Sequence, residues 1–152
     1  INFKNLLEDI LRLFDKQLKD KGLSCKVDIS NKLPEFWGDK FKLEQMLSNL
    51  IDNAIKYTEK GGIKIKIDSV GKDKIKITVE DTGIGIPKEH IPRIFERFYV
   101  VDKSRSRQLG GTGLGLSIVK HVVLSYNGEI KVESKVGVGT RFEIILPVRK
   151  KE

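Results

Sequence analysis

Two neighbouring segments alternate between apolar and polar residues, and this pattern limits the possible folds more than any other feature of the chain. Isoleucine occupies every second position from Ile63 to Ile67, with lysines between, and residues 74–80 repeat the pattern after a short turn at 71–73. Strict alternation is typical of strands that bury one face only. The two segments therefore predict a β-hairpin in a sheet with one covered and one polar face.

Other segments supply the layer that covers this sheet. Gly22 can end a first amphipathic helix, and Asp39 and Thr112 can cap two later ones. Pro87 can open a further short helix. The expected helices are 1–21, 41–58, 88–95 and 114–126, and the expected strands are 23–30, 63–70, 74–80, 129–135 and 140–148. This order predicts an α/β (α+β) two-layer sandwich, with a mixed, mainly antiparallel five-stranded sheet and about three helices on one face.

Length and composition favour one globular domain over residues 1–152. The net charge of +8 suggests an anionic ligand, but the charges are dispersed and aromatic residues are few, so nucleic acid is not expected as a partner. With a single cysteine, Cys25, no disulfide can form within the chain, which fits the cytoplasm. No apolar run is long enough to span a bilayer. Because the chain opens within a helical pattern and without Met, we expect it to be a piece of something longer.

The helix expected at 41–58 has a polar face as well as an apolar one. At about 100° per residue, Asn49, Asn53 and Lys56 lie together, with Asp52 beside them. Two amides and an ammonium suit a phosphate and its metal ion. A solvated polar face would have a similar composition, because every amphipathic helix has a polar side.

A strand is expected to end at Asp81, which is followed by a turn with glycines at Gly83 and Gly85 and an apolar residue at Ile86. An ionised carboxylate only accepts hydrogen bonds, so Asp81 would favour adenine, which presents an amino donor, over guanine, which presents an oxygen at the equivalent place. Glycines would let the backbone approach a flat ring. A tight turn with an Asx hydrogen bond would need the same residues.

Glycines also run directly into the helix expected at 114–126. Free N–H groups at that helix start would form an anion site, and close approach to a phosphate explains the surplus of glycines better than a simple cap does. The motif lacks the lysine of a Walker loop and does not follow a strand inside a βαβ unit. The loop before it holds Lys103, Arg105 and Arg107, which could close over a triphosphate or could be an ordinary solvated loop. The motif comprises Gly111, Thr112, Gly113, Leu114, Gly115 and Leu116.

Together these segments resemble the boxes of the sensor histidine kinases. Residues 49–58 resemble their N box, 81–85 the G1 box, 95–99 the F box, 111–116 the G2 box, and 134–142 the last glycine motif. The boxes follow the order and spacing of that family over nearly the whole chain. Each box alone is a weak signal, whereas five boxes in this order are specific to the family.

The resemblance implies a Bergerat-type ATP-binding fold, shared with gyrase, the Hsp90 chaperones and the mismatch-repair ATPases. It implies ATP and Mg²⁺ as cofactors, with Asn53 as the protein ligand to Mg²⁺, Asn49 and Lys56 at the phosphates, and Tyr57 near the nucleotide. Asp81 would meet the adenine amine, and residues 113–116 would hold the phosphates. The nucleotide-binding set further includes Gly83, Gly85, Ile86, Lys103, Arg105, Gly111, Thr112 and Thr140.

The resemblance also implies a phosphotransfer reaction with a separate acceptor. In the ATPase relatives a Glu one turn before the Mg²⁺ ligand activates water, but here that place is Asn49, and an amide cannot act as a base. The γ-phosphate is therefore expected to go to a histidine on a dimerisation domain, and from there to a response regulator. The isolated domain is expected to be a monomer, and the full protein a sensor kinase that can be membrane-anchored.

Two departures from the family pattern leave alternatives open. Val100 stands where many members have Arg, although Lys103 or Arg105 can substitute for that contact. The phosphoacceptor helix is absent, and His90 and His121 lie in other contexts, where surface or packing roles are expected. An anti-sigma-type serine kinase and a non-catalytic ATP-sensing module are the alternatives to a histidine kinase.

Overall fold

The computed structural model describes residues 1–102 and 113–148 of the chain. Its helices and strands follow the order expected from the sequence, with three α-helices and one 3-10 helix among the described residues. They are α1 Phe3–Lys21, β1 Ser24–Ile29, α2 Lys40–Lys56, β2 Gly62–Val70, β3 Lys74–Asp81, η1 Lys88–Arg93, α4 Gly115–Ser125, β4 Glu129–Lys135 and β5 Gly139–Pro147.

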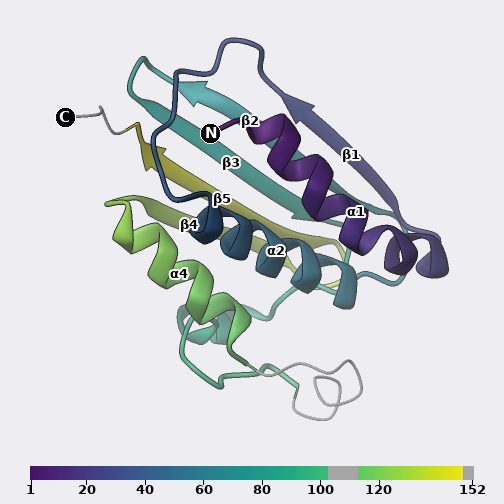
Figure 1. Cartoon of the computed structure of the whole chain (residues 1–152). Coiled ribbons are helices and arrows are strands. Elements are labelled where there is room, and N and C mark those ends of the chain that lie inside the picture. Colours follow the sequence, from purple (N-terminus) through teal and green to yellow (C-terminus); the bar gives the residue numbers. More distant parts are fainter. Residues whose placement is uncertain (103–112, 149–152) are drawn as a thin grey trace.

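The strands form one five-stranded sheet in the order β1-β2-β3-β5-β4. β1 is parallel to β2 and the other neighbours are antiparallel, which confirms the mixed, mainly antiparallel sheet. All three α-helices lie on the same face of this sheet (Figure 1). The prediction of a two-layer sandwich with one covered face is therefore confirmed.

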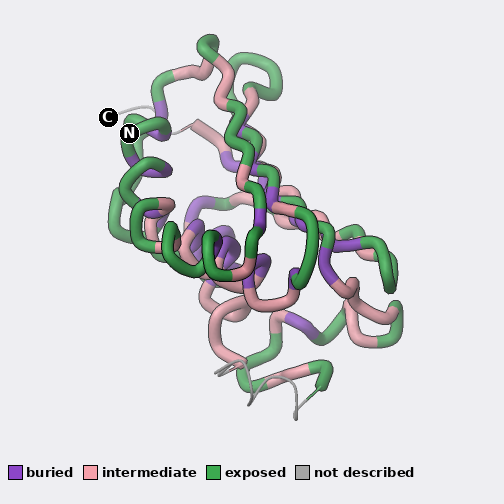
Figure 2. The backbone as a smooth tube through the Cα atoms, turned by 90° about the vertical axis from the view of Figure 1, so that its right-hand side faces the viewer, coloured by how far each residue is buried: buried purple, intermediate pink, exposed green. Residues whose placement is uncertain are grey.

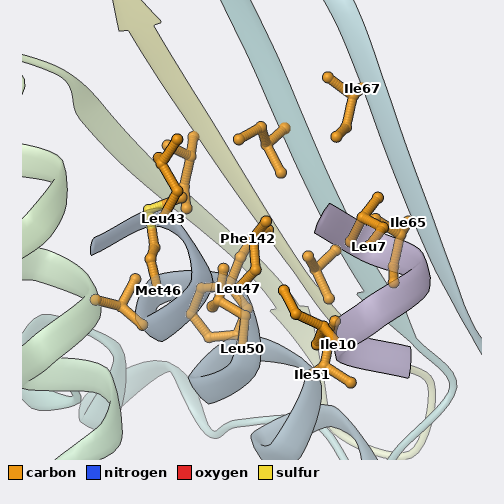
Figure 3. Packing of buried hydrophobic residues seen from close by; sticks show 14 of the residues in the cluster. Leu7, Ile10, Leu43, Met46, Leu47, Leu50, Ile51, Ile65, Ile67 and Phe142 are labelled. Atoms are coloured by element: carbon orange, nitrogen blue, oxygen red, sulfur yellow. The ribbon is translucent and has the colours of Figure 1, made fainter. Parts of the chain in front are cut away.

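The core lies between the helices and the sheet, and the buried positions gather there (Figure 2). In the hairpin of β2 and β3, the isoleucines at Ile65, Ile67 and Ile77 are fully buried, whereas the lysines between them face outward. Figure 3 shows apolar side chains of α2 and α1 meeting those of the strands, including Phe142 of β5. The apolar face of the alternating strands thus packs against the apolar stripes of the helices.

Local signals set most of the helix ends. Asp39 caps α2 through its Oδ1, which accepts from the N–H of Phe41 at 2.9 Å. Gly22 ends α1 in the left-handed conformation, with φ of 66°. The expected helix at 88–95 is instead the shorter 3-10 helix η1, because Pro92 has no N–H to continue an α-helix.

The first strand is only partly buried. Val27, which alternates with Cys25 and Ile29 along the strand, is 42% exposed. The reason is that β1 is an edge strand with β2 as its single neighbour in the sheet. The second helix also ends at Lys56, two residues earlier than expected, and Thr58 is buried in the turn that follows.

Candidate functional site

Asp81 is the last residue of β3 and is almost completely buried, with 7% of its surface exposed. Its Oδ1 accepts hydrogen bonds from the backbone N–H of Gly83 at 2.8 Å and of Thr140 at 3.2 Å. Thr140 is its partner across the sheet on β5. The carboxylate is therefore fixed both by the turn that follows it and by the neighbouring strand.

Burial raises the pKa of Asp81 above its ordinary value. The hydrogen bonds from Gly83 and Thr140 act in the opposite direction, and the neighbouring charge of Glu80 raises the pKa further. The side chain is thus a desolvated acceptor, and a ligand N–H that reaches it would replace water that it has lost. A buried carboxylate with a perturbed pKa is typical of a functional site.

The two predicted glycines after Asp81 are required by close approaches. A Cβ on Gly83 would lie 2.4 Å from the carbonyl oxygen of Tyr57. Gly85 has φ of 78°, and a Cβ there would lie 2.2 Å from the carbonyl oxygen of Lys135. Neither position has space for a side chain, so the backbone of this turn lies directly against its neighbours.

Hydrogen bonds on both sides hold the same turn. The N–H of Ile84 donates to the carbonyl of Tyr57 at 3.1 Å, which ties the turn to the end of α2. The N–H of Ile86 donates to Oγ of Ser134 at 2.7 Å, and this hydroxyl also bonds Thr140. The sequence prediction missed this role of Ser134, which no short-range pattern announces because the two residues are 48 positions apart.

The predicted polar face of α2 is present in the structure. Asn49, Asn53 and Lys56 are partly exposed on α2, and Lys56 forms an ion pair with Asp52 at 2.9 Å. The amide Nδ2 of Asn49 is buried and has no hydrogen-bond partner among the described residues. Because a buried amide without a partner is costly, this group is suited to a ligand that supplies an acceptor.

The start of α4 lies against the same face of α2. A Cβ on Gly115 would lie 3.9 Å from the side-chain Oδ1 of Asn49. Leu114 occupies the N-cap position and offers no side-chain cap, so the first N–H groups of the helix are left to other partners. Leu116 follows them in the first turn. Lys103, Arg105, Gly111 and Thr112 lie outside the described residues.

Gly113 precedes this helix and is held by the F-box segment. It has φ of 74°, and its carbonyl accepts from the N–H of Phe98 at 2.7 Å. Phe98 is itself in the left-handed region, with φ of 66°, and the residue is 63% exposed. The residue at 113 must be glycine, since a Cβ would lie 2.7 Å from the Cα of Phe98.

Tyr57 connects the two groups of candidate residues. It is the C-cap of α2, directly after Lys56, and its carbonyl binds the turn that follows Asp81. Asp81 and the polar face of α2 that carries Asn49 and Asn53 therefore belong to one continuous region. This region is formed by α2, the turn at 81–86 and the start of α4.

Two other groups of residues lie away from this region. A hollow of about 220 Å³ on the open face of the sheet has mixed charges, and neither Asp81 nor Asn53 lines it; its lining is Lys64, Lys66, Asp68, Lys76, Thr78, Glu80, Arg141 and Glu143. His121 is exposed, and His90 bonds the hydroxyl of Tyr99. These placements fit the surface and packing roles expected for the two histidines.

The described residues contain no group of three or more His, Cys, Asp or Glu side chains that could hold a metal ion. Within the same part of the chain, no helix has the length and apolar character needed to cross a membrane.

Comparison with known families identifies most of the chain. Residues 38–150 match the model of the family described as histidine kinase-, DNA gyrase B-, and HSP90-like ATPase. The match begins just before α2 and includes all of the strands except β1. It therefore covers the candidate site described above.

Two curated relatives are sensor histidine kinases. The chain is 39% identical over 147 residues to the sensor histidine kinase RppB of Synechocystis sp., covering 93% of this chain and 32% of the relative. It is 44% identical over 116 residues to the sensor histidine kinase WalK of Bacillus subtilis, covering 75% of this chain and 19% of the relative. The chain thus spans less than a third of the length of either protein.

Solved structures give the same result for the fold. The catalytic domain of histidine kinase ThkA superposes with a TM-score of 0.83 at 28% identity, covering 97% of this chain and 95% of that domain. Full-length ShkA in complex with AMPPNP superposes with a TM-score of 0.87 at 29% identity, covering 99% of this chain and 31% of ShkA.

Proposed function

Because the chain belongs to the histidine kinase-, DNA gyrase B- and HSP90-like ATPase family and is an ATP-binding catalytic domain of the sensor histidine kinase type, we propose that it transfers the γ-phosphate of ATP to a histidine on a separate dimerisation domain. A response regulator would take the phosphoryl group in turn. The cytoplasmic location expected from the sequence is part of the same proposal.

The observation that carries the proposal is the buried carboxylate of Asp81. Its Oδ1 is already occupied by two backbone donors, at Gly83 and Thr140. The other oxygen can accept from the adenine amine, and guanine has no donor at that place. Gly83 and Gly85 let the backbone of this turn pack directly against Tyr57 and Lys135, which holds the carboxylate in place.

We assign the triphosphate to the other end of the region. Lys56 supplies positive charge, and its pairing with Asp52 keeps the ammonium at the end of α2. The unpaired amide Nδ2 of Asn49 can donate to a phosphate oxygen, and so can the first N–H groups of α4 beside it. Lys103, Arg105 and Thr112 remain candidates for the same ligand.

Mg²⁺ fits the residues at this end if it arrives with the nucleotide. Asn53 would hold it through a single amide oxygen, since Mg²⁺ usually keeps several waters and takes its remaining ligands from phosphate. When bound, the ion would neutralise charge on the phosphates. The protein's own residues bind and orient the nucleotide. The amide of Asn49 cannot deprotonate water, so hydrolysis is not favoured.

Calorimetric titration with Mg-ATP, Mg-ADP and Mg-GTP tests the binding step. We expect both adenine nucleotides to bind and GTP to bind at least tenfold more weakly, since one lost charge-assisted hydrogen bond costs about 1.5–3 kcal/mol. Equal affinity for ATP and GTP would contradict the role given to Asp81. Omitting Mg²⁺ should weaken ATP binding in the wild type and have less effect in Asn53→Ala.

A phosphotransfer assay tests the reaction. With γ-labelled ATP and the acceptor domain, we expect acid-labile phosphohistidine on the acceptor and little labelling of this domain alone. Acid-stable phosphoserine on a partner would instead indicate a serine kinase of the anti-sigma type. Tight ATP binding without transfer to an intact acceptor domain would indicate an ATP-sensing module.

A further inference from the structure

The first helix reaches the end of the second through one side chain. Lys21 is the last residue of α1, and its Nζ donates to the backbone carbonyls of Ile55 at 2.6 Å, Lys56 at 3.3 Å and Thr58 at 3.1 Å. An ammonium has three N–H donors, and all three have an acceptor here. The last carbonyls of a helix lack partners within the helix and carry partial negative charge. Lys21 therefore caps α2 from another element.

The capped segment is also the one that carries the candidate site. Lys56 is assigned to the phosphates, and Tyr57 follows it. The carbonyl of Tyr57 accepts from the N–H of Ile84 at 3.1 Å, and its oxygen lies 2.4 Å from the place that a Cβ on Gly83 would take. Backbone hydrogen bonds thus connect the position of residues 55–58 to the turn that holds Asp81.

We propose that Lys21 is a positioning residue of the nucleotide site, which holds the end of α2 so that Lys56, Tyr57 and the turn at 81–86 keep their places. The inference rests on the proposed nucleotide-binding function. Lys21 lies outside the residues 38–150 that match the family model, so this role is not part of what the family match describes. Lys21 would contribute to nucleotide binding through the backbone at the end of α2, to which it is hydrogen-bonded.

The distances favour a specific role over general surface charge. Lys19, two residues earlier in the same last turn, pairs with Asp15 at 2.9 Å, and its side chain is 75% exposed. An exposed pair of this kind has little effect on stability. Lys21 instead makes three bonds to carbonyls that its own helix does not contain. Lys19→Met is therefore a matched control on the same helix turn.

The test compares Lys21→Met, Lys21→Arg and Lys19→Met by calorimetry with Mg-ATP, well below the melting temperature of each variant. We expect Lys21→Met to weaken ATP binding about tenfold, because charge-assisted hydrogen bonds are lost near the site. Lys21→Arg keeps the charge and several donors and should recover most of the affinity. Lys19→Met should bind as the wild type does.

Hydrogen exchange distinguishes a local loosening from a uniform loss of stability, which would speed exchange at all protected amides. In Lys21→Met, the amides of Tyr57 and Ile84 should exchange faster, whereas those of Ile77 and Val79 in the sheet should be unchanged. Should Lys21→Met fail to fold, Lys21→Gln keeps two N–H donors without the charge, and about a threefold loss of affinity is expected.

Wild-type affinity for ATP in the Met or Gln variant would overturn the proposal, and so would equal exchange at the Ile84 amide. Failure of the wild-type protein to bind any nucleotide would overturn the proposed function instead. The two failures differ because the exchange measurement needs no nucleotide and would still show whether Lys21 holds residues 55–58.

Discussion

The N–H of Thr140 on β5 donates to Oδ1 of Asp81 on β3 over 3.2 Å, and the N–H of Gly83 donates to the same oxygen at 2.8 Å. These bonds leave Oδ2 without a hydrogen-bond partner in the part of the chain that the structure describes. One oxygen thus has a structural role, and the other is free to meet a ligand. The two roles can be separated by substitution.

We expect Asp81→Asn to lose the preference for adenine while it keeps the fold. Its amide oxygen can still accept from Gly83 and Thr140, but the other atom becomes an N–H₂ donor and faces the adenine amine as a second donor. ATP affinity should fall at least tenfold and the ratio of ATP to GTP affinity should approach one, both measured by calorimetry.

Asp68→Asn provides the control for that substitution. Asp68 lies on β2 and lines the hollow on the open face of the sheet, away from Asp81, and pairs with Lys66 at 3.3 Å. Removing its charge should leave nucleotide affinity within about twofold, since exposed pairs contribute little. A similar loss in both variants would mean that net charge, and not the base contact, determines affinity.

The raised pKa of Asp81 predicts that ATP binding weakens on acidification earlier than for an ordinary aspartate. The ionised form accepts from adenine, so affinity should fall as the pH falls through the raised pKa. The affinity of Asp81→Asn should lack this component. Titrating both proteins with ATP over the same pH series cancels the protonation of the phosphates, and identical profiles would contradict the prediction.

The same shift has the opposite effect on folding. Between the ordinary pKa of aspartate and the raised pKa of Asp81, the native protein binds more protons than the unfolded chain, so this group's contribution to stability falls as the pH rises through that window. Above the window the buried charge disfavours the fold. We therefore expect Asp81→Asn to melt no lower than the wild type at neutral pH, measured by calorimetry.

Two glycines with similar backbone angles should respond differently to alanine. Gly85 has φ of 78° and an added Cβ would lie 2.2 Å from the carbonyl oxygen of Lys135, whereas Gly137 has φ of 80° and nothing within 4 Å. Gly137→Ala should cost about 1–2 kcal/mol of unfolding free energy from conformation alone. Gly85→Ala should cost clearly more and abolish ATP binding, because the turn must move.

Denaturant titration gives both free energies, and calorimetry gives the binding. Equal losses at the two positions would mean that the backbone around residue 85 relaxes without cost. Retained ATP affinity in Gly85→Ala would show that the turn after Asp81 tolerates displacement, which would remove the reason given for glycine at this position.

Sequence patterns predicted much of the fold because they are local. Alternation at residues 63–70 and the apolar stripe of α2 each indicate which side is buried, and Asp39 and Gly22 mark helix ends by their own backbone chemistry. Val27 is exposed although it follows the same alternation, because alternation does not reveal that a strand lies at an edge. Edge position is a property of the assembled sheet.

The candidate site could be predicted less completely than the fold. Asp81, Asn49 and Asn53 stand in recognisable motifs, and the structure places them in one region with the end of α2. The contacts of Ser134 and Lys21 could not be predicted, although Ser134 belongs to the last glycine motif, since their partners are backbone groups 48 and 34 to 37 residues away. Contacts of this kind depend on chain topology and cannot be predicted from the spacing of residues along the sequence.

The hydroxyl of Thr58 gives the last prediction. Thr58 is fully buried, and its Oγ1 has no hydrogen-bond partner among the described residues. Burying an unpaired hydroxyl costs about 1–3 kcal/mol, and valine has nearly the same shape without it. We therefore expect Thr58→Val to raise the free energy of unfolding by about 1 kcal/mol and the melting temperature by roughly 2–4 °C.

Thr78→Val, on the polar face of the sheet, should give no such gain. If Thr58→Val is less stable than the wild type, the hydroxyl must bind an ordered water molecule, and its position next to Gly83 would then make that water part of the base-binding region.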